Sequence, residues 1–323
     1  MKQYTLQIPS TLMVTCCLIA SLLSVVSCRK ENALTASDQD ENYFVVKDNP
    51  NDPVDHAIYE FYNSTGIASF YNDTIHRKRI SDSAGLPRYS YIKLSLSYTL
   101  FSNQYISFKP VSNKGRIPPL LHLLEEELLP RLPNDLLVPS FFLVDSIWTN
   151  LSDQVIDLAD GWTAWHGFNT VAISVKDVEA MHADERRMFA ASLLAGIAEK
   201  RLRKTANEIL NRDFFSISRV AAKAFTPLDI YSGSPFFIHG IDPPANTALG
   251  FVRYFINGYA VMLGLPNPVG PPGEADDLRA FLTAAFYYTP EQFAANYPGS
   301  EIMLKKLNII REIAPKAGFR LPG

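Results

Sequence analysis

Cysteine is nearly absent from this chain of 323 residues. There are three cysteines, and Cys16, Cys17 and Cys28 all lie close to the N-terminus. The rest of the chain therefore has no thiol for a disulfide bond, a thiolate metal site or a cysteine nucleophile. This excludes thiol chemistry from the part of the protein that is expected to fold.

A strong charge of one sign is also missing. The chain has 30 Lys and Arg against 33 Asp and Glu, a formal net charge of -3. It shows neither the basic stripe that would indicate a nucleic-acid partner nor the acidic tract typical of disorder. A glycine-rich phosphate loop and a nucleophile elbow for serine hydrolysis are missing as well. With 47% hydrophobic and 20% charged residues, the chain can bury a sizeable core.

The first 27 residues have the pattern of a secretory signal. Lys2 gives a positive start, residues 12–26 are apolar, and Ser27 is the small residue that precedes a cleavage site. A cysteine directly after that site is the lipobox pattern, in which the thiol receives a diacylglycerol. We therefore expect cleavage before Cys28 and lipidation at Cys28. The apolar run is shorter than the roughly 20 residues of a spanning helix, so the protein would be anchored without spanning.

After the signal, the sequence predicts a polar tether over residues 28–54 and one α+β domain over residues 55–323. The spacing of apolar residues predicts a domain that is helix-rich in its C-terminal half. The predicted helices cover residues 55–65, 118–132, 184–210, 249–263 and 276–287, and a last helix follows Ser300. The predicted strands cover residues 67–75, 140–147 and 170–175.

Several segments form a recognisable series along the chain: the lipobox, IYEFY at 58–62, FYND at 70–73, SFFLVDS at 140–146, the helix from Asp184, TPEQF at 289–293 and residues 302–321. Taken in this order, they resemble the substrate import-associated zinc metallohydrolase lipoproteins, a family typical of the Bacteroidota. The resemblance implies a zincin-like (gluzincin) metallopeptidase-type domain with zinc as cofactor. It also implies partnership with a TonB-dependent transporter and a SusD-like lipoprotein at the outer membrane.

Members of such a family would carry His-Glu-x-x-His on the long helix, where the two imidazoles bind zinc and the glutamate activates water. Here the matching stretch reads SLLAG, so Ser192 and Gly196 replace the ligands and Leu193 replaces the base. The third ligand is expected within residues 277–280, where Ala280 holds the carboxylate position. Serine is a poor zinc ligand and leucine cannot accept a proton. We therefore expect no zinc, no catalytic residue, and small side chains filling the former pocket.

Two other places carry candidate residues. Trp162, Trp165 and His166 lie in an aromatic, glycine-bounded segment that suits stacking on a sugar ring or gripping a peptide, with packing against the core as the plainer interpretation. His122 has carboxylates at helical spacing, which is more typical of a solvated helix face.

Two functions stay open at this point. The first is a non-catalytic binding or assembly component of a nutrient import system, facing either the periplasm or the outside and taking a glycan or a peptide. The second is an active metallohydrolase with a displaced site that uses His166 or His122 with nearby carboxylates. A convergent cluster of His, Asp and Glu side chains would distinguish the second from the first.

Overall fold

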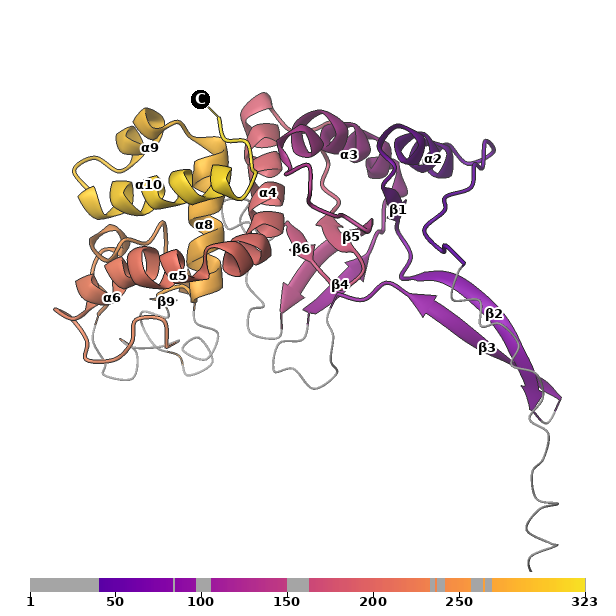
Figure 1. The fold of residues 1–323 in the computed structure, drawn as a ribbon, viewed down its shortest axis with the longest axis horizontal. Helices are drawn as coiled ribbons and strands as arrows, with labels where there is room; N and C mark the ends of the chain where they lie inside the picture. Colours follow the sequence, from indigo (N-terminus) through magenta and orange to yellow (C-terminus); the bar gives the residue numbers. More distant parts are fainter. Residues whose placement is uncertain are drawn as a thin grey trace, which may run out of the picture. The chain divides into compact units, whose positions relative to one another are not determined.

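The structure is a computed structural model that describes residues 41–83, 85–96, 106–149, 163–232, 236, 242–256, 264 and 269–322. Tyr43–Gly323 form one compact unit (Figure 1). This unit combines helices with β-sheets, which confirms the predicted α+β class. Across the described ranges, none of the helices is both long and apolar enough to cross a membrane. The predicted signal and Cys28 lie outside these ranges.

The first helix, α2 (Pro53–Thr65), has clear local causes at both ends. The Asp52 side chain accepts hydrogen bonds from two backbone N–H groups of the first turn, and a proline occupies an early position where no N–H is needed. The helix ends at Gly66, whose φ of 72° is left-handed. Ile58 and Phe61 on its inner face are buried.

The central sheet has the strand order β1-β5-β7-β6, and β4 pairs with β5 outside this path. Its strands are β1 (Ala68–Phe70), β4 (Ile106–Pro110), β5 (Ser140–Thr149), β6 (Ala164–His166) and β7 (Val171–Ser174). β1, β5 and β7 are parallel, whereas β6 runs antiparallel to β7 at the edge. Both faces of β5 are covered, since Phe141 and Leu143 join the main core and Phe142 and Val144 join a second one.

Helices dominate the chain after residue 183. They are α4 (Ala183–Thr205), α5 (Asn207–Ile209), α6 (Ser216–Ala222), α8 (Glu274–Tyr287), α9 (Pro290–Asn296) and α10 (Glu301–Lys316). The described strands here are only the short β8 (Phe255–Ile256) and β9 (Val269–Gly270). α4 packs against both β6 and α8, and Figure 1 shows it standing between the sheet and the C-terminal helices.

Two further elements lie before α4. Helix α3 (Ile117–Leu123) continues into a π-helical turn and a 3-10 turn that ends at Arg131. Strands β2 (Thr74–Ser83) and β3 (Leu86–Lys93) form a separate antiparallel hairpin. The compact unit also includes the end of the predicted tether, because Phe44 packs against Phe70.

The helix predicted over 249–263 is wrong in its described part. A 3-10 turn ends at Gly250, which has a φ of 73°, and the chain then extends into β8. The strand predicted over 67–75 is divided into β1 and the start of β2 by a bend at 71–73.

Candidate functional site

The four residues that the resemblance places at the zinc-ligand and base positions are all buried on α4 and α8. Ser192 and Leu193 have no exposed surface, Gly196 lies in the same buried run of α4, and Ala280 on α8 is 4% exposed. This burial follows from the position of α4, which is enclosed by β6 on one side and α8 on another. The Ser192 hydroxyl lies 2.6 Å from the hydroxyl of Thr163, directly before β6, and the two form a buried hydrogen bond.

The nearest carboxylate along α4 is Glu199, and it is held by two arginines. One of its oxygens accepts a 2.6 Å hydrogen bond from Arg203 Nε, and the other lies 3.3 Å from Nη2 of Arg279. Arg279 is 2% exposed, and its guanidinium lies 4.9 Å from the ring centre of Trp165. Trp165 also donates its indole N–H to the carbonyl of Leu96 at 3.2 Å. Trp165, a candidate for ligand stacking, therefore stacks on a buried ion pair.

His166, the next residue on β6, is half-buried. Lys200 of α4 donates to the backbone carbonyls of His166 and Gly167 at 3.4 and 3.2 Å. Burial and the neighbouring positive charge of Lys200 lower the pKa of His166, so the ring favours its neutral form near neutral pH. Its Nδ1 atom is buried without a hydrogen-bond partner among the described residues. Trp162, the third member of this candidate group, lies outside the described residues.

His122 is far more exposed than His166. Its side chain is 70% exposed and lies 3.3 Å from Glu126, one turn later on the same helix. In the parts of the chain that the structure describes, no three His, Cys, Asp or Glu side chains come together in a way that could hold a metal ion. The geometry therefore brings neither His122 nor His166 together with a set of carboxylates there.

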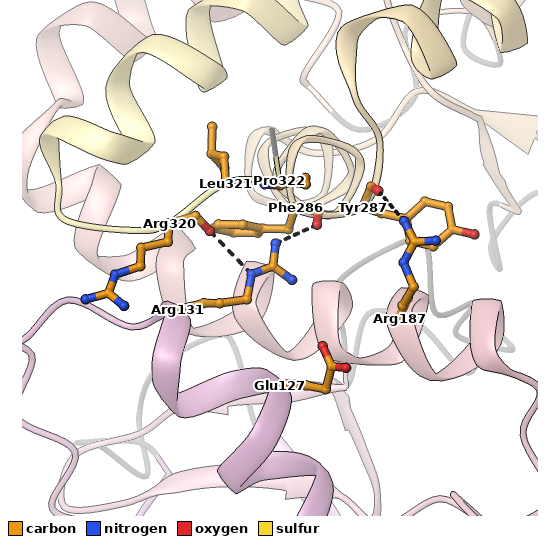
Figure 2. Close-up of a pocket in the computed structure, with 8 residues that line it drawn as sticks. All are labelled: Glu127, Arg131, Arg187, Phe286, Tyr287, Arg320, Leu321 and Pro322. Carbon is orange, nitrogen blue, oxygen red and sulfur yellow. Dashed lines mark hydrogen bonds between the residues drawn. The ribbon is translucent and has the colours of Figure 1, made fainter.

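A cavity of about 380 Å³ lies at the C-terminal end of α8 (Figure 2). Three arginines line it, which suggests an anion site at first sight. Arg131 Nη2, however, donates to the carbonyl of Phe286 at 2.7 Å, and Arg187 Nη2 lies 3.5 Å from the carbonyl of Tyr287. These carbonyls end α8 and have no partner within the helix. Arg131 and Arg187 thus act as C-terminal caps of α8, and we assign no ligand to the cavity.

A second cluster that sequence reasoning missed lies deep between α8 and α10. Lys306 Nζ is 2.6 Å from Asp277 Oδ2 and 2.9 Å from both the Ser218 hydroxyl and the Gly250 carbonyl. The Tyr231 hydroxyl donates to the same Asp277 oxygen at 2.6 Å. The five residues come from separate segments, so no local motif could have identified them.

Burial controls the protonation of this cluster. It lowers the pKa of Lys306 to about 8 and raises the pKa of Asp277. A lysine and a tyrosine beside a carboxylate would suit proton transfer, but Lys306 has no exposed surface and Asp277 is 1% exposed. A substrate would have no contact with these atoms. We interpret the cluster as a structural link between helices.

No family model, no curated protein and no solved structure matches this chain.

Proposed function

We propose that this protein is a lipoprotein of the cell envelope with a zincin-like domain that has lost its zinc site. It serves as a non-catalytic binding or assembly component of a nutrient import system of the TonB/SusD type. The observation that carries the proposal is the buried hydrogen bond between Ser192 and Thr163, at the position where the resemblance places the first zinc ligand.

The residues at these positions do not fit a zinc ion. A catalytic zinc needs three protein ligands and one open position for water. The Ser192 hydroxyl is engaged by Thr163, Leu193 is apolar and buried, and Ala280 offers only a methyl group. The carboxylate of Glu199 forms ion pairs with Arg203 and Arg279. These contacts are those of a packed helix interface, which supports a structural role for α4 and α8.

The binding role rests on what the sequence implies about location. A lipid on Cys28 would hold the domain at the outer membrane, on its periplasmic or its extracellular face. There it could contact a TonB-dependent transporter, a SusD-like lipoprotein, and a glycan or peptide in transit. For the rival function, an active hydrolase with a displaced site, the described residues offer one carboxylate beside His122, Glu126 at 3.3 Å, and no group of three side chains that could hold a metal ion.

Metal content of the processed, lipidated protein tests the loss of zinc. The protein is loaded with zinc, dialysed and measured by elemental analysis, beside an active zincin treated in the same way. We expect no retained zinc and no chelator-sensitive peptide hydrolysis. Zinc held near one ion per chain would overturn the proposal.

The assembly role needs its own experiment. Cross-linking in intact cells, followed by purification through this protein, should recover a transporter and a SusD-like lipoprotein. Recovery of neither would remove that part of the proposal, and the zinc result would stand independently.

A further inference from the structure

The β2–β3 hairpin is exposed over most of its length. The two strands pair with each other in a sheet of their own, and most of their residues are open to solvent on both faces. One face carries a stack in which the Arg77 guanidinium lies 3.6 Å from the ring centre of Tyr89 and 5.9 Å from that of Tyr91. The hairpin therefore presents ordered side chains that no described element covers.

The charge of the hairpin differs from that of the chain. Residues 74–93 contain one acidic residue, Asp82, and five basic residues: Arg77, Lys78, Arg79, Arg88 and Lys93. This gives +4 in a chain whose net charge is -3, so the remaining residues carry -7. Such a separation of charge directs the hairpin toward an anionic surface.

Apolar side chains accompany these charges. Ile80, Leu86 and Tyr91 are 58%, 71% and 51% exposed. Leu86 pairs with Ser83 beside the turn at Gly85, so an apolar side chain stands at the tip of the hairpin. Basic residues beside exposed apolar and aromatic ones are the combination that favours the interface of an anionic bilayer.

The predicted anchor joins the domain at this hairpin. The ring of Tyr43, where the compact unit begins, lies 4.7 Å from the ring of His76 on β2. Cys28 precedes Tyr43 by 15 residues. A segment of this length spans at most about 50 Å. The hairpin, about 30 Å long, is therefore within reach of a membrane that holds the lipid.

Edge protection is the competing explanation for the charges. Exposed strands carry charged side chains that prevent pairing with another chain. That purpose needs no exposed Ile80 or Leu86, so it leaves the apolar tip of the hairpin unexplained.

We propose that the β2–β3 hairpin docks on the anionic surface of the membrane that holds the lipid anchor. This inference rests on the proposed lipidation at Cys28. The exposed Arg77 and Arg88 side chains lie against lipid phosphates, and Leu86 at the tip enters the interface. Docking fixes the orientation of the domain relative to the membrane.

Hydrogen exchange of the lipidated protein on vesicles tests the docking. The protein is reconstituted in phosphatidylcholine vesicles and in vesicles that also contain phosphatidylglycerol, and exchange of the amides of residues 74–93 is compared. We expect at least tenfold slower exchange on the anionic vesicles and loss of this protection at high salt. The double variant Arg77→Gln/Arg88→Gln should weaken docking by about fivefold for each exposed cation removed.

The matched control is Lys204→Gln/Lys223→Gln, which removes two exposed cations elsewhere and should leave the protection unchanged. If the protein fails to bind phosphatidylcholine vesicles, the lipid anchor is wrong. If it binds both vesicle types with equal exchange, the anchor holds and the docking is wrong. Protection that appears only when an anionic protein is added would overturn the membrane as the partner.

Discussion

Lys306 and Asp277 form an ion pair inside the domain, with Nζ 2.6 Å from Oδ2. The pair joins α10 to α8, and Ser218 and Gly250 complete the hydrogen bonds of the ammonium group. Three aromatic rings also surround it, since Phe214, Phe251 and Phe281 lie 4.3, 5.1 and 4.7 Å from Nζ.

Removing one partner of this ion pair should lower the free energy of unfolding substantially. Asp277→Ala leaves a buried cation without its counter-charge, and we expect a loss of about 3–5 kcal/mol in the free energy of unfolding. The double variant Asp277→Leu/Lys306→Met removes both charges and should lose less than Asp277→Ala alone. Denaturant unfolding measures each value. A single-variant loss below about 1 kcal/mol would contradict the assignment of a buried, charged pair.

The hydroxyl pair Ser192 and Thr163 provides a test of the α4 interface. Ser192→Ala leaves the Thr163 hydroxyl buried without this partner, and we expect a loss of about 1–3 kcal/mol. Ser192→Ala/Thr163→Val removes both polar groups and should lose less than the sum of the two single variants. Denaturant unfolding of the three variants gives this coupling. Additive losses would show that the two hydroxyl groups do not interact.

Arg131 should stabilise the end of α8. Arg131→Ala removes charge-assisted hydrogen bonds to the carbonyls of Phe286 and Arg320, at 2.7 and 3.4 Å, and we expect a loss of about 1.5–3 kcal/mol. Arg131→Lys should recover little of it, because an ammonium cannot reproduce the planar fork. The control is Arg320→Ala, whose side chain is exposed. Equal losses in Arg131→Ala and Arg320→Ala would contradict the capping role.

Local signals explain why several elements were predictable. The helix predicted to begin at Asp55 is α2, because a capping aspartate and a terminal glycine bracket one apolar stripe. Thr289 and Gln292 form the reciprocal capping bonds of α9 that the pattern TPEQ indicates. The strand predicted over 140–147 corresponds to β5, because a continuous apolar run suits a strand buried on both faces.

Long-range contacts explain the rest. The apolar run from 249 predicts a helix, yet Gly250 is left-handed and its carbonyl accepts a hydrogen bond from Lys306, 56 residues later. The Lys306 cluster and the capping of α8 by Arg131 likewise join residues that are distant in sequence. The charge of the hairpin was missed because a count over the whole chain averages it with acidic segments.

The titration of His166 should make stability depend on pH. Burial and Lys200 lower the pKa of His166 in the folded state, so below pH 6.5 the unfolded chain binds the proton more readily. The free energy of unfolding therefore falls as pH decreases through this range, by at most about 1.4 kcal/mol per pH unit for one proton. Urea unfolding between pH 7.5 and pH 5 measures the slope.

A second histidine acts in the opposite direction, so the difference between variants is the decisive quantity. The hydrogen bond to Asp48 raises the pKa of His56, and its contribution is present below pH 6.5 and lost as pH rises. His166→Gln should remove only the fall in the free energy of unfolding that His166 causes at acid pH. The contribution of His56 should stay in place. Lys200→Gln should reduce the fall caused by His166 in part. Identical slopes for wild type and His166→Gln would show that the pKa of His166 is unchanged by folding.

Gly250 and Gly66 share a left-handed backbone but differ in their surroundings. A Cβ atom on Gly66, at φ 72°, would meet nothing within 4 Å, whereas one on Gly250, at φ 73°, would lie 2.6 Å from Ile302 Cγ2 and 3.1 Å from Lys306 Cδ. Gly66→Ala should therefore cost only the backbone strain, about 1–2 kcal/mol. Gly250→Ala adds overpacking of about 1–3 kcal/mol.

Denaturant unfolding of both glycine variants separates strain from crowding. The difference between them isolates the crowding, because the backbone strain is the same in each. Adding Ile302→Ala makes room for the new methyl group, so it should offset part of the loss in Gly250→Ala and none of the loss in Gly66→Ala. If Gly250→Ala is no worse than Gly66→Ala, the loop before β8 yields to a methyl group. In that case the hydrogen bond from Lys306 to the Gly250 carbonyl would not fix the position of the backbone at Gly250.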